Sequence, residues 1–286
     1  MDKDTIKRLI IEYQQFVANI TLIEREIHLS HQLNYVFVGL RRAGKSYLMY
    51  QQIQSLLNDG HQPEEILYFN FEDDRLVNLT VEDLDLIKVS YEELYPHKPI
   101  FFLDEIQIVE HWEKFARRLA DQQYRVYITG SNAKMLSAEI ATTLGGRYIV
   151  QNVYPFSFSE FLKASKIEIG PTWYYKNRTE IVRTFSDYFS YGGLPELMLI
   201  ETIEKRQWLS NLFNKIFFGD LITRYSIRND LAMKVLIRKL AESVKQPSSF
   251  NRLTNIVSTT GAKVSTDTII DYLNFCLLYT SPSPRD

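Results

Sequence analysis

The sequence predicts an α/β protein in which helices cover both faces of a parallel sheet, followed by a mostly helical region. Two observations carry this prediction. Apolar runs typical of buried strands alternate with amphipathic helical segments between residues 23 and 160, and beyond Pro171 the pattern is mostly helical. The run IFFL at residues 100–103 is continuously apolar, as expected of a strand that is buried on both faces.

Composition limits the class of protein further. The chain has 286 residues, of which 45% are hydrophobic and 24% charged, which is typical of a globular protein of about two domains. Its net charge of −2 gives no global attraction to nucleic acid, although a local basic face remains open. The single cysteine, Cys276, excludes an internal disulfide framework. No signal-peptide core and no apolar run of ~20 residues is visible, so we expect a cytoplasmic protein without a membrane partner.

The strongest chemical signal is a glycine-bounded loop between a predicted strand and a predicted helix. After the apolar run at residues 35–38, the segment GLRRAGKS at residues 39–46 fits G-x-x-x-x-G-K-[ST] without a mismatch. Loop amides and a helix N-terminus in this arrangement surround a phosphate chain. We expect Lys45 to reach the β- and γ-phosphates and the Ser46 hydroxyl to ligate Mg²⁺. The expected nucleotide-binding residues are Gly39, Leu40, Arg41, Arg42, Ala43, Gly44, Lys45, Ser46 and Tyr47.

A pair of acidic residues is the second chemical signal. Asp104 and Glu105 directly follow the apolar run at residues 100–103. They therefore lie at the carboxyl end of a strand, where ligands bind in open α/β sheets. We expect Asp104 to hold Mg²⁺ and Glu105 to orient and polarise an attacking water. Two adjacent carboxylates are weak evidence alone, but the phosphate-binding loop upstream makes them specific.

Two further segments are candidates for contact with the γ-phosphate, and each has a structural alternative. Ser131 or Asn132, after the next predicted strand, could contact the γ-phosphate or the attacking water, or could cap the following helix. Arg147 follows a glycine pair and is a candidate arginine finger, in the same chain or toward a neighbouring subunit. The alternative for Arg147 is a surface arginine after a turn. The expected catalytic residues are Lys45, Glu105, Asn132 and Arg147.

Several segments together are similar to a known family. VGLRRAGKS, FNFEDDRL, FFLDEIQ, ITGSN, LGGRY, YPFSFSEFL and YGGLPE resemble the bacterial and archaeal ATP-binding proteins of the AAA superfamily that carry a C-terminal domain of unknown function. The resemblance implies a P-loop NTPase fold with a three-layer α/β/α parallel sheet. It also implies that Asp104 and Glu105 take the Walker B role, that Ser131 and Asn132 lie in the sensor region, and that Arg147 lies near the γ-phosphate. A strand between the P-loop strand and the Asp-Glu strand would match the hydrolysing branch of these proteins.

The expected organisation has five parts. An N-terminal helix at residues 1–22 precedes the ATPase domain at residues 23–160, a helical linker or lid region at 161–225 and an incomplete winged-helix-like module at 226–276. The YGGLPE segment reads as an architectural turn, because no Lys or Ser follows its glycines. Residues 277–286 contain the Ser/Pro coil TSPSPRD, whereas the family continues well past this point, so we expect a non-native or disordered tail.

Residues 248–275 look like a helix-turn-helix, whose second helix would read bases in a DNA complex. Asp267 and Asp271 on that helix would repel phosphates, and Arg252 and Lys263 are the few basic residues nearby. For this segment the sequence therefore favours packing or protein contact at least as much as base reading, so a DNA partner and a protein partner both stay open, and a homo-oligomer is open as well.

The sequence predicts an ATPase that hydrolyses ATP to ADP and phosphate with Mg²⁺ and couples the nucleotide state to movement of the C-terminal helical module. The alternative is a nucleotide-gated switch or a DNA- or protein-binding module with little turnover. The helical C-terminal region, which has no catalytic constellation of its own, favours that alternative. A small-molecule kinase fits less well, because no arginine-rich lid is visible and Glu105 suits attack by water. ATP is preferred over GTP only through the family resemblance.

Overall fold

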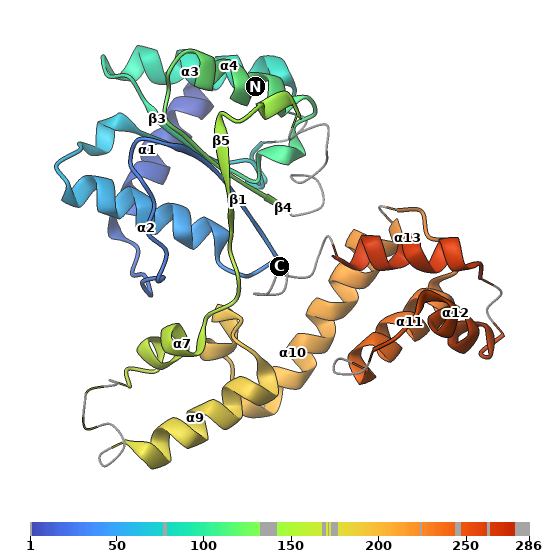
Figure 1. The fold of residues 1–286 in the computed structure, drawn as a ribbon. Helices are drawn as coiled ribbons and strands as arrows, with labels where there is room; N and C mark the ends of the chain where they lie inside the picture. The colour runs from blue at the N-terminus through green and yellow to red at the C-terminus, as the bar shows by residue number, and fades with distance from the viewer. Residues whose placement is uncertain are drawn as a thin grey trace. The chain divides into compact units, whose positions relative to one another are not determined.

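The computed structural model describes residues 2–76, 79–131, 142–167, 170, 172, 177–223, 225–243, 247–261 and 264–277. The chain folds into two compact units, residues 1–200 and residues 201–286 (Figure 1). The first unit contains the sheet and the second is helical. No helix in the described part combines the length and apolar character that a bilayer span requires.

A parallel sheet organises the first unit. Its described strands are β1 (Asn34–Gly39), β2 (Ile66–Asn70), β3 (Ile100–Asp104), β4 (Val126–Ser131) and β5 (Tyr148–Asn152). They are ordered β2-β3-β4-β1-β5, and every pair is parallel. Strand β4 therefore lies between β1 and β3, as the family resemblance implied. Because the strands share one direction, their carboxyl ends lie at one edge of the sheet.

Helices cover both faces of this sheet, which confirms the predicted three-layer α/β/α fold (Figure 1). The helix α2 (Lys45–Asn58) packs on one face, and α3 (Val81–Leu94) and α4 (Trp112–Asp121) pack on the other. Alternate residues of β1 serve the two cores: Val36 and Val38 face α3 and α4, while Phe37 faces α2. On the α2 side, the rings of Phe102 and Tyr127 stack with centroids 4.5 Å apart.

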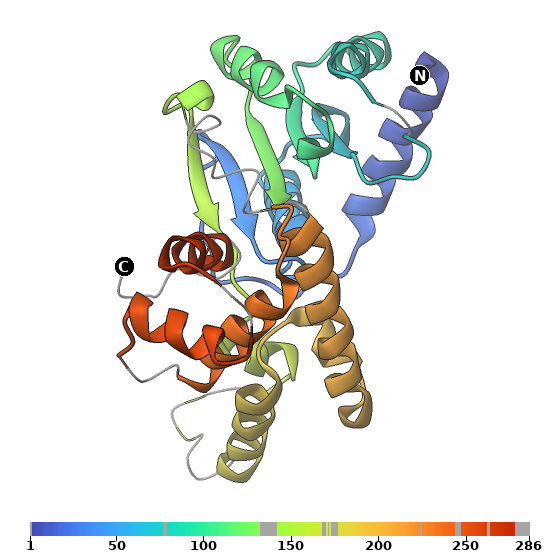
Figure 2. The same ribbon diagram turned by 90° about the vertical axis from the view of Figure 1, so that its right-hand side faces the viewer.

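The N-terminal helix α1 (Lys3–Asn19) belongs to the same unit. It lies along the edge strand β2 and contacts α2 and α3, and it is the dark-blue helix at the right of Figure 2. Asp2 caps it by accepting a hydrogen bond from the Thr5 amide at 2.8 Å. This helix covers a sheet edge that would otherwise expose unpaired backbone groups.

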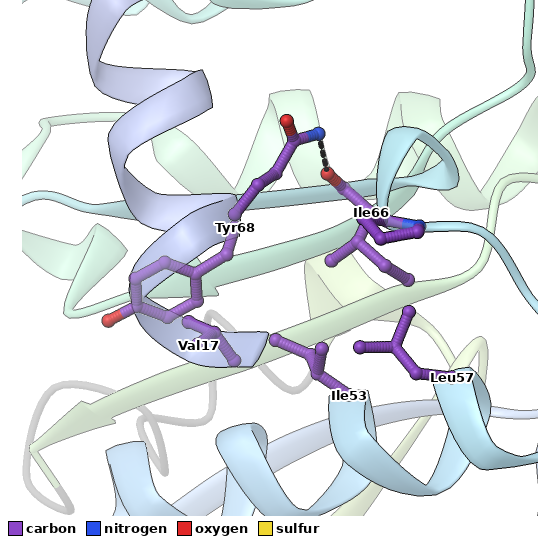
Figure 3. Close-up of a pocket in the computed structure, with 7 residues that line it drawn as sticks. Val17, Ile53, Leu57, Ile66 and Tyr68 are labelled. Atoms are coloured by element: carbon purple, nitrogen blue, oxygen red, sulfur yellow. Dashed lines mark hydrogen bonds between the residues drawn. The ribbon is translucent and has the colours of Figure 1, made fainter. Parts of the chain in front are cut away.

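A small pocket lies between α1, α2 and β2 (Figure 3). Its walls are mainly apolar, and the amide of Gln14 donates to the Ile66 carbonyl at 2.8 Å across it. Tyr68 contributes its ring, and Figure 3 shows the hydroxyl pointing away from the pocket. With no charged group in its lining, this pocket is part of the core packing and not a site for chemistry. The lining residues are Gln14, Val17, Ile53, Leu57, Pro63, Ile66 and Tyr68.

The chain after β5 continues to pack in the first unit. It forms α7 (Phe158–Ala164), α9 (Arg178–Tyr191) and the short 3-10 helix η3 (Pro195–Leu199); two other short 3-10 helices are η1 (Pro63–Glu65) and η2 (Ile106–Ile108). The Phe156 amide donates to the Gly193 carbonyl at 2.7 Å, and a Cβ on Gly193 would lie 2.3 Å from the Phe156 oxygen. This close backbone approach explains the glycine in YGGLPE, and Pro195 begins η3.

The second unit is a helical module. It consists of α10 (Thr202–Asn214), a π-helical segment η4 (Lys215–Thr223), α11 (Asp230–Glu242), α12 (Phe250–Ser258) and α13 (Thr266–Leu277). Leu236, Leu253, Val257 and Ile269 join the last three helices in one core. The Ser265 side chain accepts a hydrogen bond from the Thr268 amide at 3.1 Å and so caps α13. The sequence predicts this role of Ser265 as the cap of the second helix. The predicted tail lies outside the described residues, apart from Leu277.

The first compact unit ends at residue 200 and so includes α1, α7 and α9 together with the sheet. The helical linker predicted for residues 161–225 is therefore shared between the two units. The physical reason lies in buried side chains: Leu9 of α1 enters the sheet core, and Glu160 at the start of α7 forms a buried ion pair with Arg25.

Candidate functional site

The glycine loop connects β1 to α2 at the carboxyl edge of the sheet. A Cβ on Gly39 would lie 2.1 Å from the Val153 oxygen, so only glycine fits there. Gly44 is the N-cap of α2 with φ +96°, a conformation that glycine adopts readily. Among the described residues no side chain caps this helix. Its first amides are therefore open to an anion, and the helix dipole favours negative charge at the same place.

Lys45 is a buried cation at this helix N-terminus, with 5% of its surface exposed. Its Nζ donates to the carbonyls of Gly39 and Leu40, each at 3.3 Å, and lies 3.9 Å from Glu105 Oε1. Burial lowers the pKa of Lys45, and the charges of Glu105 and Asp104 oppose that shift. Neutral carbonyls are weak partners for a buried ammonium, so an anionic ligand would improve its environment.

Asp104 is a buried carboxylate at the end of β3, with 2% exposure. It accepts hydrogen bonds from the Tyr68 hydroxyl at 2.7 Å and from the Thr129 hydroxyl. Burial raises the pKa of Asp104, and hydrogen bonds from Thr129, Tyr68 and Ser46 oppose the rise. Asp104 and the Ser46 hydroxyl are thus neighbours.

The Asp104 carboxylate and the Ser46 hydroxyl both offer oxygen, the ligand atom that Mg²⁺ prefers. A cation there would also compensate the buried charge of Asp104. No cluster of three or more acidic, histidine or cysteine side chains suited to a metal occurs in the described part of the chain. The donor set therefore fits a Mg²⁺ whose remaining ligands come from nucleotide and water.

Glu105 follows with its backbone in the left-handed region, at φ 56°. For a residue with a Cβ this conformation costs on the order of 1 kcal/mol and persists only where the surroundings impose it. Here the Glu105 amide donates to Thr129 Oγ1 at 2.9 Å, and the Gln107 amide group donates to the Glu105 carboxylate. The strained turn directs a partly exposed carboxylate, 18% accessible, toward Lys45.

Thr129 and Tyr68 are site residues that the sequence reading missed. The Thr129 hydroxyl donates to Asp104 and accepts from the Glu105 amide, so one oxygen positions both acidic residues. Tyr68 extends the network, because its hydroxyl lies 3.0 Å from that of Tyr50 on α2. Both residues sit in strands where they read as core. The signal in the sequence is the threonine that ends the run YRVYIT, two residues before Ser131.

The two arginines of the loop each face a glutamate. Arg41 Nη1 lies 3.9 Å from Glu72, which follows β2, and Arg42 forms an ion pair with Glu196 of η3. Tyr47 is 52% exposed and its ring packs on Tyr50. The loop is thus connected to the segment YGGLPE, for which the sequence predicts only an architectural turn.

Arg147 is not at this edge of the sheet. It precedes β5, its carbonyl accepts from Asn34 at the start of β1 at 3.3 Å, and its side chain pairs with Asp121. The length of β1 separates it from the loop, about 20 Å for six residues. The expectation that Arg147 lies near the γ-phosphate of its own chain is therefore wrong, because a turn before a parallel strand lies at the amino edge. A role toward a neighbouring subunit stays a prediction.

The structure thus brings Lys45, Ser46, Asp104 and Glu105 together and leaves Arg147 apart. Asn132 and the side chain of Ser131 lie outside the described residues.

Comparison with known proteins agrees with this geometry. Residues 31–162 match the model of a family described as an AAA domain. An uncharacterized protein of Methanocaldococcus jannaschii is 32% identical over 277 residues, covering 96% of this chain and 61% of its own length. An uncharacterized protein of Haemophilus influenzae is 32% identical over 265 residues, covering 88% of this chain and 64% of its own. The chain thus spans less than two thirds of either relative.

Among solved structures, AMPPCP-bound DnaA from Aquifex aeolicus aligns with 94% of this chain and 86% of its own at 13% identity. The TM-score of 0.36 is too low for that alignment to bear on function. The match over residues 31–162 includes the glycine loop, Asp104, Glu105 and Thr129. Residues 31–162 therefore match an AAA domain, and the parallel sheet with its glycine loop has the α/β fold of a P-loop protein.

Proposed function

We propose that this protein binds ATP with Mg²⁺ and hydrolyses it to ADP and phosphate. The observation that carries the proposal is the convergence of a buried lysine, a buried carboxylate and a partly exposed glutamate at an uncapped helix N-terminus. Mg²⁺ held by Asp104 and Ser46 would supply charge neutralisation on the phosphates. The loop amides bind and orient the phosphate chain, and Lys45 exchanges its carbonyl partners for phosphate oxygens.

In this proposal Glu105 is the water-orienting base. Its carboxylate is accessible, and its backbone is fixed by Thr129. Attack by water requires a residue that accepts a hydrogen bond from the water and aligns it with the γ-phosphorus. A carboxylate is a residue of this type.

Two substitutions test the assignment by separating binding from turnover. We expect Lys45→Ala to weaken ATP binding strongly, because it removes the cation that contacts the phosphates. Glu105→Gln keeps shape and polarity, so ATP binding should persist while turnover falls by about a hundredfold or more. Titration calorimetry and a phosphate-release assay measure the two effects. Unchanged turnover in Glu105→Gln would defeat the catalytic assignment.

A nucleotide-gated switch with little turnover is the second candidate, and the ion pair between Arg42 and Glu196 favours it. A γ-phosphate in the loop would compete with Glu196 for the Arg42 guanidinium. Because η3 leads directly into α10, release of Glu196 would alter the segment that connects the AAA domain to the helical module. We propose this contact as the route by which nucleotide state moves that module.

Limited proteolysis with ATP and with ADP, in the unchanged protein and in Glu196→Gln, tests the switch. We expect cleavage near residue 200 to depend on the nucleotide in the unchanged protein and to lose that dependence in the variant. Adding DNA or candidate proteins to the turnover assay tests whether residues 248–275 bind a partner. Strong stimulation would favour a motor, and negligible turnover with nucleotide-dependent cleavage would favour the switch.

A further inference from the structure

A buried arginine outside the glycine loop contacts the loop's backbone. Arg25 precedes β1 and is only 5% exposed. Its Nη1 donates to the Ala43 carbonyl at 3.0 Å, its Nη2 to the Tyr154 carbonyl at 2.6 Å, and its Nε to Glu160 at 2.9 Å. All three nitrogens of the guanidinium thus have partners, and the group lies 5.0 Å from the centre of the Phe156 ring. No residue of the sequence motif for phosphate binding requires such a contact.

The partners of Arg25 are themselves fixed. Glu160 accepts hydrogen bonds from the amides of Glu26 at 2.9 Å and Ser157 at 2.8 Å in addition to Arg25. The backbone of Arg25 exchanges two hydrogen bonds with the Gln51 side chain on α2, at 2.7 and 3.1 Å. The ion pair is therefore satisfied on both sides, which is the condition under which a buried pair is tolerated. The segment YPFSFSEFL supplies most of these partners.

The contact with Ala43 acts on the orientation of one peptide group. A trans peptide is planar, so its C=O and N–H point in opposite directions. Holding the Ala43 carbonyl toward Arg25 turns the Gly44 amide to the other side of the loop. Without this contact the Ala43–Gly44 peptide could rotate readily, because Gly44 has no Cβ and accepts both signs of φ. Gly44 has φ +96°, and an added Cβ would lie 3.3 Å from Arg25 Nη1.

We propose that Arg25 is a positioning residue for nucleotide binding. It locks the Ala43–Gly44 peptide so that the Gly44 amide faces the phosphate cradle, by which we mean the space inside the loop Gly39–Ser46 where the phosphates would bind. This inference rests on the proposed function of the loop. Glu160 neutralises the arginine, so preorganisation of the cradle, and not added positive charge, is the contribution. Loop amides contact the α- and β-phosphates, so ATP and ADP should depend on Arg25 to the same extent.

Binding of ATP and ADP to Arg25→Lys, measured by titration calorimetry with Mg²⁺, tests the inference. Lysine keeps the charge, but its donors radiate from a single nitrogen and cannot reproduce the planar fork that reaches Ala43, Tyr154 and Glu160. We expect both affinities to fall by about tenfold, with an unchanged ratio between them. KM for ATP should rise by the same factor while kcat at saturating ATP stays within about twofold, a split that a general loss of stability would not produce.

Glu26→Ala is the matched control. Its carboxylate joins the same two segments through Ser159 at 2.8 Å and Lys163 at 2.9 Å, but at the surface and away from Ala43. We expect this variant to bind both nucleotides like the unchanged protein. Equal losses in Arg25→Lys and Glu26→Ala would overturn the inference, as would full affinity in Arg25→Lys.

If Arg25→Lys does not fold, Glu160→Gln decides, because glutamine keeps an acceptor for Nε but weakens the hold on the guanidinium. A smaller loss, equal for ATP and ADP, is expected; full affinity in this variant would overturn the inference. Absence of nucleotide binding in the unchanged protein would instead overturn the proposed function, and this inference with it.

Discussion

Charged side chains are buried at the carboxyl edge of the sheet and exposed at its amino edge. At the carboxyl edge, Lys45, Asp104 and Arg25 are buried, and each takes part in a network of hydrogen bonds. At the amino edge, Arg147 and Asp121 form an exposed ion pair that water can replace. Burying an ionised group is costly unless partners compensate it, and such groups concentrate at functional sites. The comparison therefore favours our proposal that the carboxyl edge is the functional one.

The largest effect should come from Asp104→Asn, which removes the buried charge and keeps the shape. We expect Mg²⁺-dependent turnover to fall by about a thousandfold, because the amide is a poor ligand for a hard cation. ATP affinity measured in EDTA should change little. Titration calorimetry with and without Mg²⁺ measures how far ATP affinity depends on the metal, and a phosphate-release assay measures turnover. If both depend on Mg²⁺ in the variant as they do in the unchanged protein, Asp104 is not a ligand of the metal.

An intermediate effect should come from Thr129→Val, which deletes the hydroxyl shared by Asp104 and Glu105. Both acidic residues lose a fixed partner, so we expect kcat to fall by about tenfold to a hundredfold with little change in KM. Thr129→Ser retains the hydroxyl and should keep most of the activity. Steady-state kinetics distinguish the pair, and similar losses in Val and Ser variants would show that packing, not the hydroxyl, matters.

A smaller effect should appear in the pH dependence of stability. Burial raises the pKa of Glu160, but hydrogen bonds from Arg25 and from the Ser157 and Glu26 amides outweigh it and hold the pKa below the ordinary 4.5. A depressed folded-state pKa gives stability that is present above the unfolded-state value and lost as pH falls through the folded one. We expect the melting temperature to fall less steeply below about pH 4.5 in Glu160→Gln than in the unchanged protein. Parallel curves by circular dichroism would contradict this account.

The smallest effect should come from Arg147→Ala. The pair with Asp121 is exposed, so dilute protein should keep its turnover within about twofold and lose at most about 1 kcal/mol of stability. Assays across a range of protein concentrations extend the test to assembly. A loss confined to high concentration would support a finger directed at a neighbouring subunit, whereas a loss at every dilution would contradict the position at the amino edge.

The same contrast explains what the sequence could predict. Local pattern identified the strands, the glycine loop and the pair Asp104 and Glu105, because each depends on residues adjacent in the chain. Thr129 meets Asp104 and Glu105 only through strand order. Glu160 meets Arg25, and Glu196 meets Arg42 of the loop, only through the return of the chain after β5. Arg147 was misplaced for the same reason, since a glycine turn does not reveal which edge of the sheet it occupies.

A structure of Glu105→Gln crystallised with Mg²⁺ and ATP tests the central claim most directly. We expect the triphosphate to lie along Gly39–Ser46, with Lys45 on its phosphates and the metal between Ser46 and Asp104. A nucleotide bound elsewhere would contradict the assignment of this edge as the active site. So would a loop without nucleotide at saturating ATP, with Lys45 still bonded to the Gly39 and Leu40 carbonyls.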